Sequence, residues 1–149
     1  MSRGAPDYSG MKVDVVLRSE WASVKGLDKH ITGFKALDDY EDYGYAVQYE
    51  VEAEKVFYIT GFYCVGWAQI AANAELPLPF RVELEVGGAP MARAGGYFGG
   101  WFVLPSPVAV QAGYEAKVLV VNLSNHGVSF MGGAVGYELG PDDGEVLPE

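Results

Sequence analysis

The stretch VFYITGFYCVGWAQIAANA, residues 56–74, contains no charged side chain and decides which fold class the sequence predicts. Its length would allow it to cross a membrane as a helix, which takes about 20 mostly apolar residues. Glycines and polar residues interrupt it, however, and its first half alternates β-branched and aromatic residues with the period of two that is typical of strands. Both faces of this predicted strand are apolar, so we expect both to be covered, by a second sheet, a loop or another chain.

The composition favours one compact all-β domain. The chain has 149 residues, which is enough for a single core. Half of the residues are hydrophobic, 13% are aromatic and 20 are glycine, a balance that favours short strands and turns over helices. Further strands are expected at residues 13–18, 45–52, 80–86, 115–123 and 128–139.

Three other segments are predicted differently. Between residues 26 and 40 the apolar side chains approximate helical spacing behind Asp28, a possible cap, but a Thr-Gly pair interrupts them. We therefore expect a short helix or an irregular loop there. The segment AGGYFGGWF, residues 94–102, is expected to be a glycine-aromatic loop. After it, Pro105 and Pro107 confine the next strand to the edge of a sheet.

This pattern predicts three parts. About seven or eight short strands separated by turns indicate an antiparallel β-sandwich or a barrel, because no helical crossovers occur between them. We place the β-sandwich domain at residues 44–139. An extended N-terminal arm and an irregular segment occupy residues 1–43, and an acidic tail occupies residues 140–149.

The charge of the chain limits its partners. Twenty acidic against ten basic residues give a net charge of −10, and such a surface repels the phosphate backbone of nucleic acids. We expect neither nucleic acid nor an anionic membrane as a partner. The opening residues 1–12, MSRGAPDYSGMK, lack the apolar core of a signal peptide, so export by the usual route is not expected.

The sequence predicts no catalytic residue, no metal site and no cofactor. Cys64 lies in the apolar stretch and is expected to be a buried small side chain rather than a reactive thiol. His30 and His126 are too far apart in sequence for a recognisable zinc motif. The acidic cluster at residues 38–42 lacks the spacing of a calcium loop, and the glycosylation sequon at Asn122 ends an apolar strand, so we attribute it to chance.

Aromatic residues are the stronger candidates for function. Four of them lie between glycines in the segment 94–102, where they could anchor a protein partner or stack on sugar rings. The alternative is that they fill the core of this domain, which carries more weight for Phe102 than for Trp101 or Tyr97. The candidate contact residues, for a partner or for a subunit interface, are Tyr8, Trp21, Tyr97, Phe98, Trp101 and Phe102.

The order of the strand segments is also informative. KVFYITGF begins at Lys55, and FRVELEVGG and a glycine-rich loop follow. PSPVAVQAGY then begins at Pro105, and KVLVVNLSN and GGAVGYEL close the series. Over roughly residues 44–139 this order resembles the small jelly-roll proteins of tailed-bacteriophage particles. The resemblance lies in a pattern of strands and not in an active-site signature.

The resemblance implies a jelly-roll-like sandwich that acts as a capsid cement or decoration protein. Such a protein is made in the host cytoplasm, sits on the outer capsid surface of the virion as a homotrimer, and bridges subunits of the major capsid protein through its arm. The acidic surface and the apolar strands suit that placement. Deleting residues 1–12 is then expected to weaken attachment.

Two other function classes are alternatives to a capsid protein. A carbohydrate- or receptor-binding sandwich would present an exposed row of tryptophan and tyrosine side chains, drawn from Trp67, Tyr97 and Trp101. A small cupin-like enzyme would need a cluster of histidines and carboxylates around a metal, which two separated histidines do not favour.

Overall fold

The computed structural model describes residues 27–68 and 78–141 of the chain. Within these ranges the backbone forms eight strands and no helix, and therefore no helix that could span a membrane. The strands are β1 (Asp28–Leu37), β2 (Tyr43–Glu50), β3 (Val56–Ala68), β4 (Phe80–Val86), β5 (Ala89–Gly96), β6 (Gly99–Gln111), β7 (Glu115–Asn122) and β8 (Val128–Leu139).

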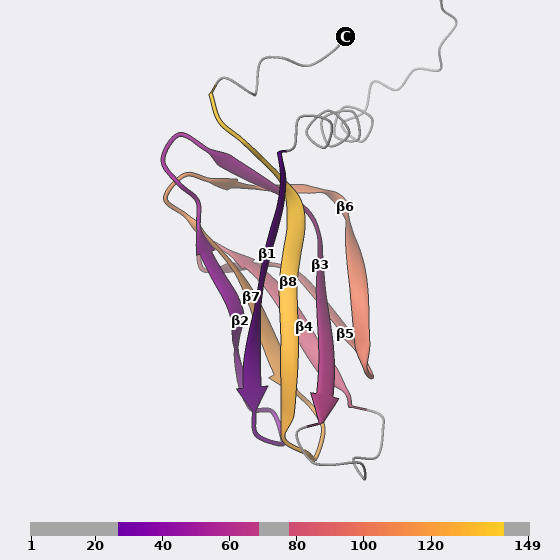
Figure 1. Ribbon diagram of the computed structural model, residues 1–149. Helices are drawn as coiled ribbons and strands as arrows, with labels where there is room; N and C mark the ends of the chain where they lie inside the picture. The colour runs from indigo at the N-terminus through magenta and orange to yellow at the C-terminus, as the bar shows by residue number, and fades with distance from the viewer. Residues whose placement is uncertain (1–26, 69–77, 142–149) are drawn as a thin grey trace, which may run out of the picture.

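The strands form two antiparallel sheets that lie face to face (Figure 1). The first sheet has the order β1-β8-β3-β6, and the second has the order β2-β7-β4-β5. Each connection except the β4–β5 hairpin runs from one sheet to the other. Eight strands in two sheets with this connectivity make a jelly roll. The expected all-β antiparallel sandwich is thus confirmed.

The tight β4–β5 hairpin depends on two glycines. Gly87 and Gly88 have φ angles of 60° and 85°, which a side chain beyond glycine adopts only at a cost. A two-residue turn with positive φ at both positions matches the right-handed twist of the flanking strands. The glycine pair that ends the expected strand at residues 80–86 therefore also begins a strand, β5, that the sequence analysis did not anticipate.

The core fills the space between the sheets. The charge-free stretch supplies β3, which pairs with β8 on one side and β6 on the other. Against β8 the register of β3 shifts between Ile59 and Gly61, which marks a β-bulge at Thr60. Against β6 the register also shifts there, but the additional residues, 104–107, lie on β6. Because of the extra residue in β3, Phe57 and Ile59 point inward before the bulge and Phe62 points inward after it.

The expectation of a helix or loop at residues 26–40 is wrong. Residues 28–37 form β1, an edge strand paired with β8 along its whole length, and Ile31 and Leu37 are buried in the core. Phe34 points the other way and is exposed. The apolar spacing resembled that of a helix because an outward-facing Phe34 lies between two inward-facing residues. The sandwich therefore begins at Asp28, within the segment that the sequence analysis assigned to the N-terminal part.

The glycine-aromatic segment also differs from its prediction. Gly95 and Gly96 belong to β5 and Gly99 and Gly100 to β6, so only the two residues between them form a turn. The prediction for the next segment is confirmed, because β6 is an edge strand that contains Pro105 and Pro107. The strand expected at residues 13–18 lies outside the described residues.

Candidate functional site

The two sheets present very different outer faces. Cross-strand partners point to the same side of a sheet, so the register assigns each side chain to a face. On the second sheet, Glu83 is paired with Arg93, whose Nε lies 2.9 Å from its Oε2. Tyr45 Oη donates a hydrogen bond of 3.0 Å to Glu85 Oε1, and this bond raises the pKa of Tyr45. With Lys117 beside them, these groups make the face polar and charged.

The outer face of the first sheet is apolar. Three cross-strand rows run across β1, β8, β3 and β6, which lie side by side in this sheet (Figure 1). The rows are Phe34, Met131, Val65 and Gly99; Thr32, Gly133, Tyr63 and Trp101; and His30, Val135, Gly61 and Val103. None of these twelve residues is Asp, Glu, Lys or Arg.

Large side chains in these rows are open to solvent. Phe34, Trp101 and Val103 expose 62%, 56% and 73% of their surface, and Val65 is also exposed. A contiguous exposed patch of this kind marks an interaction site more often than scattered single residues do. We refer to six of the seven large apolar side chains of the rows, leaving out Val135, as the apolar face: Phe34, Tyr63, Val65, Trp101, Val103 and Met131.

Tyr63 lies at the centre of the apolar face and is fixed there. Its Oη donates a hydrogen bond of 2.8 Å to Thr32 Oγ1, and His30 Nε2 lies 2.6 Å from the same oxygen. The ring reaches from β3 over Gly133 of β8 to β1, since a Cβ at Gly133 would lie 2.7 Å from Tyr63 Oη. Trp101 stacks on it with nearly parallel rings, so Trp101 is exposed while Tyr63 is largely covered.

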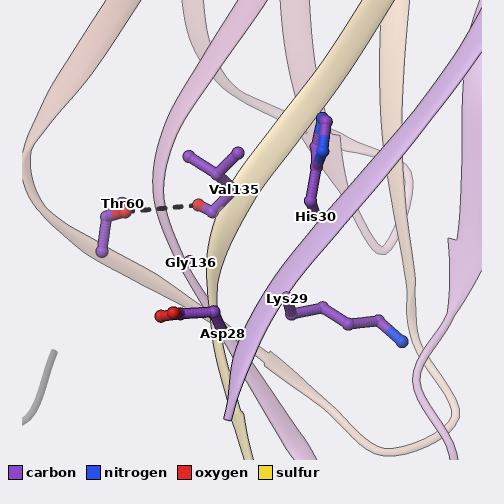
Figure 2. Close-up of a pocket in the computed structure, with 6 residues that line it drawn as sticks. All are labelled: Asp28, Lys29, His30, Thr60, Val135 and Gly136. Atoms are coloured by element: carbon purple, nitrogen blue, oxygen red, sulfur yellow. Dashed lines mark hydrogen bonds between the residues drawn. The ribbon is translucent and has the colours of Figure 1, made fainter. Parts of the chain in front are cut away.

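A shallow depression of about 310 Å³ borders the apolar face at the end toward the start of β1. Figure 2 shows the residues that line it, which are Asp28, Lys29, His30, Thr60, Val135 and Gly136. Thr60 Oγ1 donates a hydrogen bond of 3.3 Å to Val135 O across the depression. The row beyond the last of the three rows contains Asp28, Tyr137, Tyr58 and Ala109, so Asp28 brings a carboxylate to the β1 end of this border.

The structure separates the predicted contact residues. Trp101 is on the apolar face, whereas Tyr97 and Phe98 are exposed in the turn between β5 and β6. Phe102 points inward and packs on Phe62, with the ring centroids 5.4 Å apart, so it belongs to the core. The remaining two candidates, at positions 8 and 21, lie outside the described residues, as does the side chain at position 67.

Five of the six side chains of the apolar face were not among the candidates. Phe34 was missed because its segment was read as a helix or loop. Tyr63 and Val65 belong to the stretch that was recognised as apolar on both faces, and that reading was the signal that could have found them. Nothing in the sequence singles out Val103 or Met131, and only the strand register places them beside β3.

The residues considered for a reactive thiol or for metal binding have structural roles wherever their contacts assign one. Cys64 is buried as expected, and its burial raises the pKa of the thiol to about 12. Asp42 caps its own loop, accepting hydrogen bonds from the backbone N–H groups of Asp38 and Tyr43. Among the described residues, no group of three or more His, Cys, Asp or Glu side chains could hold a metal ion.

Asn122 of the sequon is buried and fully hydrogen-bonded. Its Nδ2 donates to the carbonyl oxygens of Asp38, at 2.9 Å, and His126, at 2.7 Å. Its Oδ1 accepts from the N–H and the hydroxyl of Ser124. A glycan on Nδ2 would break the first two bonds, so the side chain serves to hold the turn after β7.

A second polar group lies at the other end of the sandwich. Tyr49 Oη donates a hydrogen bond to Glu138 Oε2, and the Nζ atoms of Lys29 and Lys55 lie 3.8 and 3.9 Å from the other carboxylate oxygen. Burial and the neighbouring Glu138 carboxylate raise the pKa of Tyr49 well above its ordinary value. This network joins β1, β2 and β8, and it is structural.

No protein-family model matches the chain, and no curated protein matches it in sequence.

Proposed function

We propose that this protein is a structural component of a virion, a cement or decoration protein that binds the outer surface of a phage head and stabilises it by bridging capsid subunits. The observation that supports this is the contrast between the two faces of the sandwich. The first sheet presents an apolar face suited to burial against protein, and the second sheet presents charged side chains suited to solvent.

Burial of the apolar face could supply the free energy for docking. Burial of apolar surface contributes about 25 cal/mol per Å² before the costs of association are subtracted. A homotrimer would bury such surface and would present several copies of the chain to neighbouring capsid subunits. The net charge of −10 suits the outside of a particle rather than the side that faces the genome.

The test is binding to capsids. Heads that lack the protein are mixed with the purified full-length chain, pelleted, and compared with untreated heads for bound protein and for the temperature at which they release DNA. We expect saturable binding, a higher release temperature, and immunogold label on the outer surface of intact virions. Removal of residues 1–12 should reduce the bound amount. Heads that bind no protein and show no label would overturn the proposal.

A carbohydrate- or receptor-binding module is the second candidate. The stack of Trp101 on Tyr63 favours it, because one broad ring surface faces solvent beside the hydroxyl of Thr32 and the ring of His30. Aromatic platforms of this kind can stack on a sugar ring. Glycan-array binding that Trp101→Ala abolishes, together with no binding to heads, would favour this module over the capsid protein.

A further inference from the structure

We propose that the apolar face is a homotypic interface, at which a second copy of this chain packs against the first. The inference deepens the proposed function, on which its biological setting rests, by assigning contact between copies to one face of one sheet. It concerns the six residues of the apolar face and the uncharged rows around them.

Charge selects the second copy as the occupant. Two copies of a chain with a net charge of −10 repel each other wherever their carboxylates meet. The outer face of the second sheet carries Glu83 and Glu85, and the loops beside it carry further acidic residues. The three rows of the first sheet contain no Asp, Glu, Lys or Arg. Two like-charged copies can therefore meet there without placing carboxylates opposite one another.

The same argument disfavours a cationic partner. A basic protein would be drawn to the acidic surfaces and would gain no charge pairing on the apolar face. A face without charge matches another face without charge, and each copy of this chain supplies one. Self-pairing through a single patch is the geometry of two-fold dimers, the commonest homo-oligomers, whereas a trimer would bring different parts of the patch together around its axis.

The shape of the face suits a flat contact. Gly61, Gly99 and Gly133 occupy one position in each row, where no side chain rises from the sheet. Tyr63 is held by its hydrogen bonds and exposes only 8% of its surface, so little conformational freedom remains to be lost on association. Trp101 stands beside it as an exposed anchor, and tryptophan is enriched among the residues that dominate interfaces.

The experiment compares two lysine variants of the full-length chain. Val103→Lys places a charge on the apolar face, and Tyr43→Lys places the same charge on the outer face of the second sheet. Their exposures are similar, at 73% and 66%, so neither change should disturb the core. Mass is measured by light scattering and sedimentation velocity across a dilution series, and the fold is checked by circular dichroism.

We expect the wild type and Tyr43→Lys to form the same oligomer at micromolar concentration. Val103→Lys should remain folded and should weaken association at least about tenfold, because it buries a charge without a partner. A dimer or a trimer that Val103→Lys disrupts supports the interface. A monomeric wild type at every soluble concentration overturns it, as does an oligomer that Val103→Lys and Tyr43→Lys affect equally.

A labelling measurement gives a second readout. Val103→Cys and Tyr43→Cys each add one exposed thiol to a chain whose own Cys64 is buried. Maleimide should modify Val103→Cys slowly at high protein concentration and quickly after dilution, whereas Tyr43→Cys should react at one rate throughout. Equal rates for Val103→Cys at both concentrations contradict the interface. Head binding is scored separately, so association through this face without head binding rejects the proposed function and retains the interface.

Discussion

The rings of Tyr63 and Trp101 lie 5.5 Å apart at their centroids with an interplanar angle of 15°, on neighbouring strands of the first sheet. Tyr63 is held from the other side by His30 and Thr32 of β1. One side chain of β3 thus links both edge strands of the sheet, across β8 in one direction and directly to β6 in the other. This arrangement makes the centre of the apolar face rigid.

Tyr63→Phe removes the hydroxyl and keeps the ring. Because the hydrogen bonds of this hydroxyl with Thr32 and His30 are lost, we expect the free energy of unfolding to fall by about 1 kcal/mol. Urea denaturation followed by circular dichroism measures it. Tyr97→Phe, in the exposed turn, is the control and should leave the unfolding midpoint where it is. Equal midpoints for Tyr63→Phe and the wild type would show that the hydroxyl does not hold the ring.

Gly133→Ala adds one carbon where β1, β3 and β8 approach closely. The new Cβ would lie 2.5 Å from the backbone oxygen of Ile31 and 2.7 Å from Tyr63 Oη. Relief requires both a shift of the β1 backbone and a movement of the Tyr63 ring, and we expect a loss of about 1–3 kcal/mol of stability. Thermal unfolding measures it, with Ala109→Ser as a control that adds one atom at an exposed position of β6. A neutral Gly133→Ala would mean that the β1 backbone and the Tyr63 ring both shift without cost.

Asn122→Asp tests whether the sequon residue is structural. The carboxylate cannot donate, so the carbonyl oxygens of Asp38 and His126 lose their partner and face a negative charge. We expect a loss of about 2–3 kcal/mol in urea denaturation. Asn125→Asp makes the same charge change at an exposed position of the same turn and should cost little. The claim fails if both variants unfold at the same urea concentration.

The Tyr49 hydroxyl predicts a pH dependence in the alkaline range. Its folded pKa is raised above the ordinary value of 10.0, so the unfolded chain releases this proton first as the pH rises. The contribution of Tyr49 to stability is therefore full below pH 10 and is lost above it. Between pH 9 and pH 11 the wild type should lose more stability than Tyr49→Phe. Tyr43→Phe should follow the wild type, and parallel curves for Tyr49→Phe would refute the assignment.

Sequence periodicity predicted most of the strands because their inward faces are strictly apolar. In β4, Val82 and Leu84 point into the core and are fully buried, whereas Glu83 between them points to the outer face. The strand β7 alternates in a similar way around Val118. The alternation failed to reveal β1, where an exposed Phe34 breaks the contrast between faces. At Thr60 a bulge changes which residues of β3 point inward, and no pattern in the sequence marks that position.

The candidate site was predicted only in part, because its residues come together through pairing across strands. Tyr63 is hydrogen-bonded to His30 and Thr32, which precede it by 33 and 31 residues. The sequence shows that each is present but not that they share a face. Trp101 was chosen for its glycine-rich surroundings, and all four of those glycines prove to be strand positions, of which Gly99 lies on the same face as Trp101. The prediction that one strand is apolar on both faces therefore identified β3 correctly, but it identified few of the residues that lie beside β3 on the apolar face.

The prolines of β6 disfavour the addition of another strand at this edge of the first sheet. Pro105 and Pro107 lack the backbone N–H that an added strand would need at this border of the first sheet. A neighbouring molecule cannot easily extend the hydrogen-bond ladder there, and open-ended stacking into fibres is blocked along that direction. A partner on the β6 side is therefore expected to pack over the face of the sheet rather than to join this edge, which favours small closed clusters of fixed size over strand-linked filaments.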